Sequence, residues 1–146
     1  MGEVRAVTGR EVHASAQAVF AALADYAAVR PKLLPEQFSG YGVRVGGMGA
    51  GTVVGWRLQA TKKRARDVVV SVSEPAPLTL VEWDANSSMV TTWSVEGHGD
   101  HAHVSVESVW SGASGVGGFF ERAFAPRGLN RINDRVLANL AALVES

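Results

Sequence analysis

The chain of 146 residues contains no cysteine. Disulfides, thiolate nucleophiles and cysteine-ligated metal sites are therefore excluded together, and nothing indicates an oxidising compartment. An excess of charge of one sign is also missing, because 14 lysines and arginines balance 14 aspartates and glutamates. A formal net charge of zero argues against electrostatic binding to nucleic acid, which needs a basic field.

Long hydrophobic runs are absent as well. No apolar run approaches the roughly 18 residues of a membrane-spanning helix, and Met1 to Arg5 lack the apolar core of a secretory signal. We therefore expect a cytoplasmic protein without stable membrane insertion. The composition, 47% hydrophobic and 19% charged, is typical of an ordered globular protein, and the length fits a single domain over residues 1–146.

The strongest pattern in the sequence lies between Phe119 and Val144. Apolar residues recur there at helical spacing while the opposite face is polar, which predicts one long amphipathic helix. The apolar stripe consists of Leu129, Ile132, Val136, Leu137, Leu140, Leu143 and Val144. Pro126 predicts a break or kink, preceded by a short helix or turn over Val116 to Ala125. Because an isolated helix of this length is marginal in water, the stripe needs a partner surface.

That surface is a predicted antiparallel sheet. Ser15 is a good N-cap for a short helix over Ala16 to Leu23, and a second short helix is expected from Tyr26 toward Leu34. From Phe38 onward the hydrophobic period changes from about 3.6 to about 2, which indicates strands. The expected strands are Glu3 to His13, Phe38 to Val45, Thr52 to Thr61, Arg64 to Ser73, a strand through Thr79, Val81 and Trp83, one from Met89 to Val95, and His101 to Trp110. The last six form a meander joined by short turns, and the first strand would pair beside the last.

Three segments carry a family resemblance. Val12-His13-Ala14-Ser15-Ala16-Gln17-Ala18-Val19-Phe20 with Leu23-Ala24-Asp25-Tyr26, the turn Gly49-Ala50-Gly51-Thr52 before a strand containing Trp56, and the terminal Arg127 to Glu145 helix resemble the START-related polyketide cyclase and lipid-transport superfamily (SRPBCC). The resemblance implies the α+β helix-grip fold. In this fold a seven-stranded antiparallel sheet curls around a long C-terminal helix, two short helices lie between strands 1 and 2, and a pocket holds apolar ligands. Because the superfamily includes cyclases, transporters, hormone receptors and chaperone activators, membership does not select a function.

Aromatic residues on the more apolar strand faces predict the lining of such a pocket. Core packing is the alternative interpretation, but a sheet curled around one helix leaves space for aromatic side chains to line. The predicted ligand-binding residues are Trp56, Leu58, Val70, Trp83, Met89, Thr91, Trp93, Val106, Ser108, Phe120, Phe124, Ile132 and Val136. Their ligand would be a small apolar or aromatic molecule, lipid-like or polyketide-like.

Few titratable groups are predicted to face this pocket. Thr91 and Ser108 are expected to point inward, whereas Arg57, Glu82, His103 and Glu107 are expected to point outward. Arg66 is the one charge in phase with an inward face. A register error of one residue would reverse the facing of a whole strand.

This shortage of acids and bases favours a binding or carrier protein. The alternative is a polyketide cyclase or dehydratase that uses Arg66, Thr91 or Ser108 and an acid or base that the sequence does not identify. A third hypothesis is a subunit that acts through its surface. The ligand, the oligomeric state and the catalytic residues, if there are any, stay open at this point.

A histidine-rich turn is the one cluster that resembles a metal site. His98, Asp100, His101 and His103 are suitable ligand types for zinc or nickel. The cluster is local, however, and no distant ligand is marked in the sequence. We therefore expect an exposed polar hairpin, with neither a metal nor a cofactor.

Two further motifs have simple structural interpretations. Gly46 to Gly51 lacks the Gly-Lys-Ser/Thr ending of a phosphate-binding loop and precedes a strand, so a flexible rim to the pocket is expected instead. Lys62, Lys63, Arg64 and Arg66 are expected to form a solvated hairpin tip rather than a nucleic-acid contact.

Overall fold

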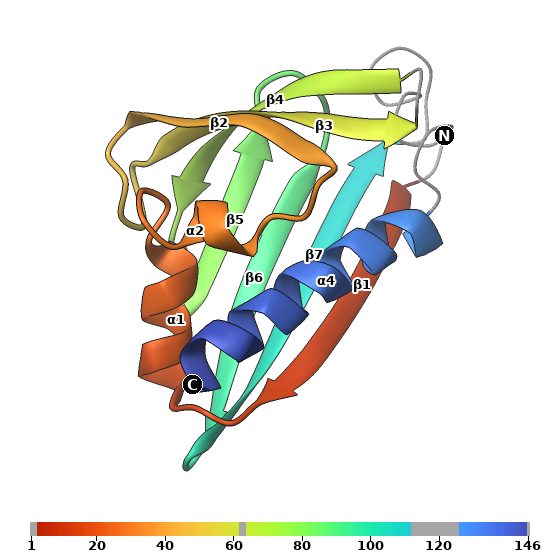
Figure 1. The fold of residues 1–146 in the computed structure, drawn as a ribbon. Helices are drawn as coiled ribbons and strands as arrows, with labels where there is room; N and C mark the ends of the chain where they lie inside the picture. The colour runs from red at the N-terminus through yellow and green to blue at the C-terminus, as the bar shows by residue number, and fades with distance from the viewer. Residues whose placement is uncertain (1–2, 62–63, 112–125, 146) are drawn as a thin grey trace.

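The computed structural model describes residues 3–61, 64–111 and 126–145. These residues form seven strands and three helices (Figure 1). The strands are β1 (Glu3–Val12), β2 (Phe38–Val45), β3 (Val53–Thr61), β4 (Arg64–Ser73), β5 (Thr79–Asp84), β6 (Val90–His98) and β7 (His101–Ser111). The helices are α1 (Ala16–Ala24), α2 (Arg30–Leu33) and α4 (Pro126–Glu145). None of these helices is long and apolar enough to cross a membrane.

The strands form one antiparallel sheet in the order β1-β7-β6-β5-β4-β3-β2. The sheet curls around α4, which lies along β1 and also contacts α1 and α2 (Figure 1). The predicted meander, the pairing of the first strand with the last, and the helix-grip architecture are therefore confirmed. The physical reason is that a sheet with one apolar face and a single amphipathic helix bury both apolar surfaces by facing each other.

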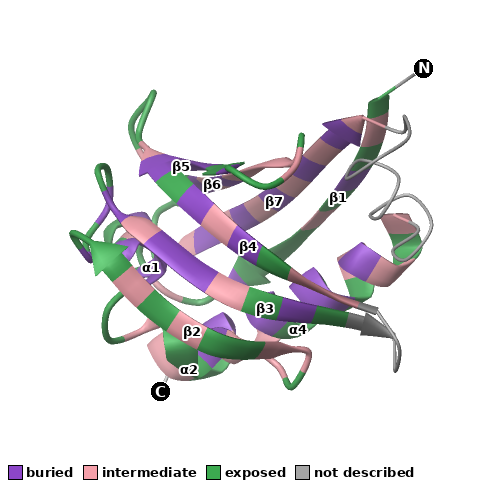
Figure 2. Cartoon of the chain, turned by 90° about the horizontal axis from the view of Figure 1, so that it is seen from above, coloured by how far each residue is buried: buried purple, intermediate pink, exposed green. Residues whose placement is uncertain are grey.

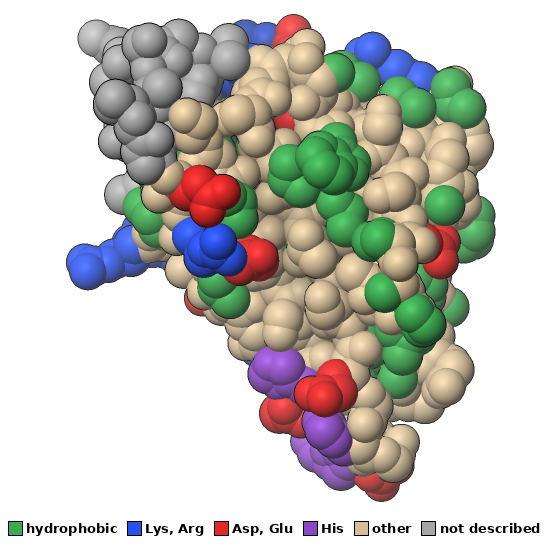
Figure 3. Space-filling model, turned by 180° about the vertical axis from the view of Figure 1, so that it is seen from behind, with side chains coloured by type: hydrophobic (Ala, Val, Ile, Leu, Met, Phe, Trp, Pro, Cys, Tyr) green, Lys and Arg blue, Asp and Glu red, His purple; other side chains and the backbone are tan. Residues whose placement is uncertain are grey.

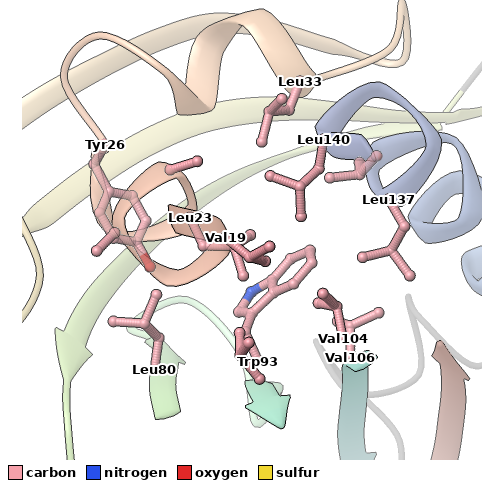
Figure 4. Close-up of a cluster of buried hydrophobic side chains, with 14 of the residues drawn as sticks. Val19, Leu23, Tyr26, Leu33, Leu80, Trp93, Val104, Val106, Leu137 and Leu140 are labelled. Atoms are coloured by element: carbon pink, nitrogen blue, oxygen red, sulfur yellow. The ribbon is translucent and has the colours of Figure 1, made fainter. Parts of the chain in front are cut away.

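The core lies between the concave face of the sheet and the helices. Every second residue of β7 is buried, from Ala102 to Trp110, and the same is true of Val68, Val70 and Val72 in β4 (Figure 2). The centre of the core joins α1, the sheet and α4, as the labelled side chains around Trp93 show (Figure 4). The predicted inward faces of β4 and β7 are correct, because a strand buried on one face alternates with period 2.

The short helices follow the predicted caps only in part. The Ser15 hydroxyl accepts a hydrogen bond from the Ala18 N–H at 3.2 Å, so the predicted N-cap of α1 is correct. The second helix begins at Arg30 rather than Tyr26. The residues between them form a turn, because the Asp25 carboxylate accepts the Ala28 N–H and the Asp25 carbonyl accepts the N–H of Arg30.

Helix α4 begins at Pro126. Proline is tolerated at the first helical position, because a backbone N–H there would have no partner within the helix. The predicted stripe of α4 is buried from Leu129 to Leu140, and Asn133, a polar residue that was not assigned to the stripe, is buried with it. The short helix or turn expected over Val116 to Ala125 lies outside the described residues.

The facing of β5 was predicted wrongly. Trp83 is 55% exposed on the convex face, whereas Glu82 is only 4% exposed and points inward. Apolar residues occur on both faces of this six-residue strand, so its periodicity does not distinguish them. The pairing decides instead: Glu82 lies opposite Thr91 of β6, and directly opposed residues of an antiparallel pair share a face.

We expect Ile132→Asp and Val136→Asp each to unfold the protein or make it insoluble. Both positions face the sheet, with exposures of 6% and 2%. An unpaired buried charge costs several kcal/mol, a large part of the roughly 5–15 kcal/mol that stabilises a domain. Arg135→Asp at an exposed position of the same helix is the matched control. Thermal unfolding followed by circular dichroism is the measurement, and an unchanged midpoint for Ile132→Asp would show that the helix does not pack in this way.

Candidate functional site

A cavity of about 60 Å³ lies between the concave face of the sheet, α2 and α4. Its lining comes from segments that are far apart in the sequence. The lining residues are Arg30, Leu34, Phe38, Tyr41, Trp56, Leu58, Val68, Glu82, Met89, Thr91, Trp93, Ser108, Leu129, Asn133 and Val136. Most of them are apolar or aromatic, and a small polar group lies among them.

The structure brings part of the predicted set together at this cavity. Seven of the predicted residues line it: Trp56, Leu58, Met89, Thr91, Trp93, Ser108 and Val136. Val70, Val106 and Ile132 are buried in the core without lining the cavity. Trp83 lies on the opposite face of the sheet, so its assignment to the pocket was wrong. Phe120 and Phe124 lie outside the described residues.

A buried ion pair occupies one wall of the cavity. Arg30 Nη1 donates to Glu82 Oε2 at 2.8 Å, and the two side chains are 3% and 4% exposed. The Tyr26 hydroxyl donates to the same carboxylate oxygen at 2.6 Å. The expectation that Glu82 points outward is therefore wrong, and a charged pair lies where the sequence analysis expected none.

The guanidinium of Arg30 is held on several sides. Its Nη2 donates to the Leu23 carbonyl at 2.8 Å. The guanidinium carbon lies 4.4 Å from the centre of the Tyr26 ring and 4.9 Å from that of Trp93, distances at which a cation is attracted to a ring face. One side chain thus connects the end of α1, the turn before α2, β5 and β6.

These contacts keep Arg30 charged and Tyr26 neutral. Burial by itself lowers the pKa of Arg30, but its interactions with Tyr26 and Glu82 outweigh that effect and raise the pKa above the ordinary value. Burial raises the pKa of Tyr26 well above its ordinary range; Arg30 opposes this shift and Glu82 adds to it. Tyr26 therefore remains a hydrogen-bond donor to Glu82.

A pair of hydroxyl groups lies on the sheet side of the cavity. Thr91 and Ser108 are opposite each other on β6 and β7, and their side-chain oxygens are 2.8 Å apart. Two buried nitrogens of the lining, Nε of Arg30 and Nε1 of Trp93, have no hydrogen-bond partner among the described residues. The wall therefore has unused hydrogen-bonding capacity.

Three half-buried aromatic rings form the more exposed part of the lining. The ring of Trp56 stacks on Tyr41 with centroids 6.2 Å apart and meets Phe38 edge-on at 6.0 Å. The Tyr41 hydroxyl donates to the Tyr26 carbonyl at 2.6 Å. Partial burial raises the pKa of Tyr41; Arg30 opposes this shift, while Glu82 and Asp25 add to it.

The sequence analysis missed Arg30, Glu82 and Asn133. Arg30 lies between Val29 and Pro31 in a predicted short helix, and the sequence pattern there indicates no buried face. Glu82 lies between Val81 and Trp83, and only its pairing with Thr91 reveals its direction. Asn133 comes four residues after Leu129 and three before Val136, so helical spacing places it within the apolar stripe of α4. Helical spacing could therefore have identified Asn133, whereas local periodicity contains no signal for Arg30 and Glu82, because the direction of each depends on a partner distant in sequence.

Arg66, the charge that the sequence analysis placed in phase with the pocket, lies elsewhere. It is opposite Leu58 in the β3–β4 pairing and donates to the Asn86 carbonyl in the turn after β5. It is not among the residues that line the cavity.

The histidines gather at one end of the molecule together with acidic side chains (Figure 3). His101 contacts Asp100 and His103 contacts Glu11, each through Nδ1 at 2.5 Å. Within the described ranges no three histidine or acidic residues are grouped so that they could hold a metal ion. The contacts of His101 and His103 with neighbouring carboxylates are typical of the polar end of a hairpin.

The glycine-rich loop packs against the corner between α1 and α2. The Gly47 carbonyl accepts the N–H of Tyr26 and Ala27, and the Gly49 N–H donates to the Ala24 carbonyl. Gly49 has φ +59°, a conformation that favours glycine. No residue of this loop lines the cavity, so the expected rim is formed by Phe38, Tyr41 and Trp56 instead.

The two tyrosines of the chain give a test of the site that depends on pH. Both have raised pKa values in the folded protein. The folded state then holds more protons than the unfolded state above pH about 10, so stability is complete below that pH and falls as the pH rises through it. We expect little tyrosinate absorbance from the native protein at pH about 11, where the denatured chain is ionised.

The control is Tyr26→Phe, which should make the alkaline loss of stability less steep in denaturant titrations. Ordinary titration of both tyrosines in the folded protein, near pH 10, would contradict the buried network.

Comparisons with known proteins agree with this architecture. A family model described as polyketide cyclase / dehydrase and lipid transport matches residues 3–145. None of the curated proteins compared with the chain matches it. Among solved structures, the NMR structure of the KanY protein is 51% identical, covers 100% of both chains and superposes with a TM-score of 0.90.

Two more distant structures share the fold. A START superfamily protein from Mycobacterium smegmatis is 15% identical over 99% of this chain and 98% of its own, with a TM-score of 0.71. The Zhui aromatase/cyclase from a Streptomyces species is 16% identical over 99% and 94%, with a TM-score of 0.69. At these identities the likeness concerns the fold alone. The match of the family model over nearly the whole chain goes further: this protein belongs to the polyketide cyclase / dehydrase and lipid transport family.

Proposed function

We propose that the protein binds a small apolar or aromatic molecule in the cavity, as a carrier or binding protein. The observation that supports this is the character of the lining, in which aromatic and aliphatic side chains surround a few polar groups. Small-molecule sites typically have this composition, because the apolar surface provides affinity and the polar groups fix orientation. Arg30, Glu82, Thr91 and Ser108 supply those polar groups here.

The size of the cavity indicates that its wall must adapt to a ligand. At about 60 Å³ it is smaller than the roughly 150 Å³ of an engineered apolar cavity that binds benzene. The outer lining contains the half-buried Phe38 and Tyr41 of β2, which is an edge strand. The pairing of β2 with β3 is irregular between Ser39 and Gly42, and Gly40 has φ +61°. An edge with few fixed hydrogen bonds is the part of this wall that moves at the lowest cost.

We expect an uncharged aromatic probe to saturate the site at micromolar concentration and to change the tryptophan emission. Toluene, indole and naphthalene cover a useful range of sizes. Trp93→Ala should change probe affinity more than Val90→Ala, because Trp93 lines the cavity and Val90 lies on the convex face. Trp83→Phe, also on the convex face, should leave affinity unchanged.

A solidly packed core would behave differently. In that case no probe would saturate, and Trp93→Ala would chiefly lower stability, by about 3–5 kcal/mol. Flat titrations with all three probes, on protein shown to be folded, would reject the binding function and favour a protein that acts through its surface.

A second candidate function is a cyclase or dehydratase that acts in the same cavity. The observation that favours it is the carboxyl group of Glu82 inside the lining, in contact with Arg30, which the sequence analysis did not locate. Glu82 Oε1 accepts no hydrogen bond from the described residues, so it is available to take a proton from a carbon next to a carbonyl. The Arg30 guanidinium would stabilise the resulting enolate oxygen.

This second function predicts an effect on rate rather than on binding. If a short β-polyketone is converted to an aromatic product, Glu82→Gln should lower the rate by roughly 10²–10⁴-fold while the protein still binds a neutral aromatic probe. Glu107→Gln, which changes an exposed ion pair with Arg5, should leave the rate unchanged. Appearance of the product is followed by absorbance. Equal rates with and without the wild-type protein would reject the enzyme function and leave the binding function untouched.

A further inference from the structure

The formal charges of the cavity wall cancel. Among the described residues that line it, Arg30 is the one cation and Glu82 the one anion, and they are in direct contact at 2.8 Å. Both side chains are almost completely buried, where an unpaired charge is strongly disfavoured. An arginine free of a carboxylate would attract an anionic ligand, but Arg30 already has its counter-ion.

The hydrogen-bonding groups of the same wall are not all used. Glu82 Oε2 accepts from both Arg30 and Tyr26, while Oε1 accepts from none of the described residues. On the donor side, Nε of Arg30 and Nε1 of Trp93 are buried without a partner within the described ranges. Both nitrogens have almost no accessible surface, so Glu82 Oε1 is the group of this wall that a ligand can reach.

We infer that this wall selects uncharged ligands that carry a hydroxyl group and that it rejects anions. The inference rests on the proposed binding function and adds the chemical class of the ligand. A hydroxyl group can donate a hydrogen bond, so it matches Glu82 Oε1, the open acceptor of this wall.

The two other ligand classes fit less well. A hydrocarbon of the same shape excludes water from Glu82 Oε1 without giving it a hydrogen-bond donor. A carboxylate brings a second negative charge next to Glu82, and the single positive charge of Arg30 cannot balance both. The order of affinity follows as hydroxylated aromatic first, aromatic hydrocarbon second, and aromatic carboxylate last.

Phenol, toluene and benzoate test this order at neutral pH, because they share a ring and differ in one substituent. Titrations followed by amide NMR shifts give a Kd for each. We expect phenol to bind about tenfold more tightly than toluene, which corresponds to one hydrogen bond to a charged group, and benzoate not to saturate. The binding shifts should include residues of β5 and β6, on which Glu82 and Trp93 lie.

Glu82→Gln is the decisive variant. It keeps the shape of the side chain and an acceptor for Arg30 and Tyr26, but it leaves the cavity wall with a net positive charge. Benzoate should then bind more tightly than phenol, which reverses the wild-type order. Glu107→Gln removes an exposed carboxylate elsewhere and should preserve the wild-type order.

The outcomes separate this inference from the function on which it rests. Toluene binding as tightly as phenol, or benzoate binding more tightly than phenol to the wild type, overturns the inference while the binding function stands. Absence of binding by all three probes removes the binding function together with the inference. If Glu82→Gln does not fold, the wild-type order of the three probes decides the matter.

Discussion

The buried contact between Arg30 and Glu82 is the constraint that connects the helical corner to the sheet. A guanidinium that is 3% exposed must have a counter-ion and hydrogen-bond acceptors within reach. Glu82 and the Leu23 carbonyl provide them, and the rings of Tyr26 and Trp93 enclose the charge. Because removal of one partner of such a pair typically costs about 3–5 kcal/mol, α2 and β5 cannot separate cheaply. The glycine-rich loop then hydrogen-bonds to the backbone of Tyr26, so the same contact also positions this loop.

The cavity exists where polar residues interrupt otherwise apolar inward faces. Ser108 is the one polar residue on the buried face of β7, which otherwise consists of Ala102, Val104, Val106 and Trp110. In β6, Thr91 lies on the same face as Trp93. These polar side chains, with Glu82 of β5, hydrogen-bond to one another or to Arg30 rather than filling the space as larger apolar groups would. The result is a wall that combines apolar surface with a few polar groups. The two proposed functions would use this same wall, and they differ in whether Glu82 only orients a ligand or also takes its proton.

Periodicity predicted the elements whose environment is uniform along their length. Helix α4 presents one continuous stripe to the sheet, and β7 alternates over its whole length, so both were identified with the correct facing. The strand order followed from short turns, since consecutive strands joined in this way pair as neighbours. Prediction failed at β5, where Leu80, Val81 and Glu82 are all buried and alternation disappears. It also failed at the start of α2, where side-chain and main-chain contacts of Asp25 form a turn instead of a helix.

The sequence by itself determined the fold class and about half of the cavity lining, because both depend on local spacing of apolar residues along a strand or a helix. Trp56, Trp93, Thr91 and Ser108 were identified as inward residues for this reason. The polar wall was decided only by the tertiary structure. Arg30 and Glu82 are separated by 52 residues, and neither has a neighbour in sequence that reveals the pairing. Burial of a charge depends on a partner that the fold brings close, and the register of β5 against β6, which is a property of the assembled sheet, sets that partner.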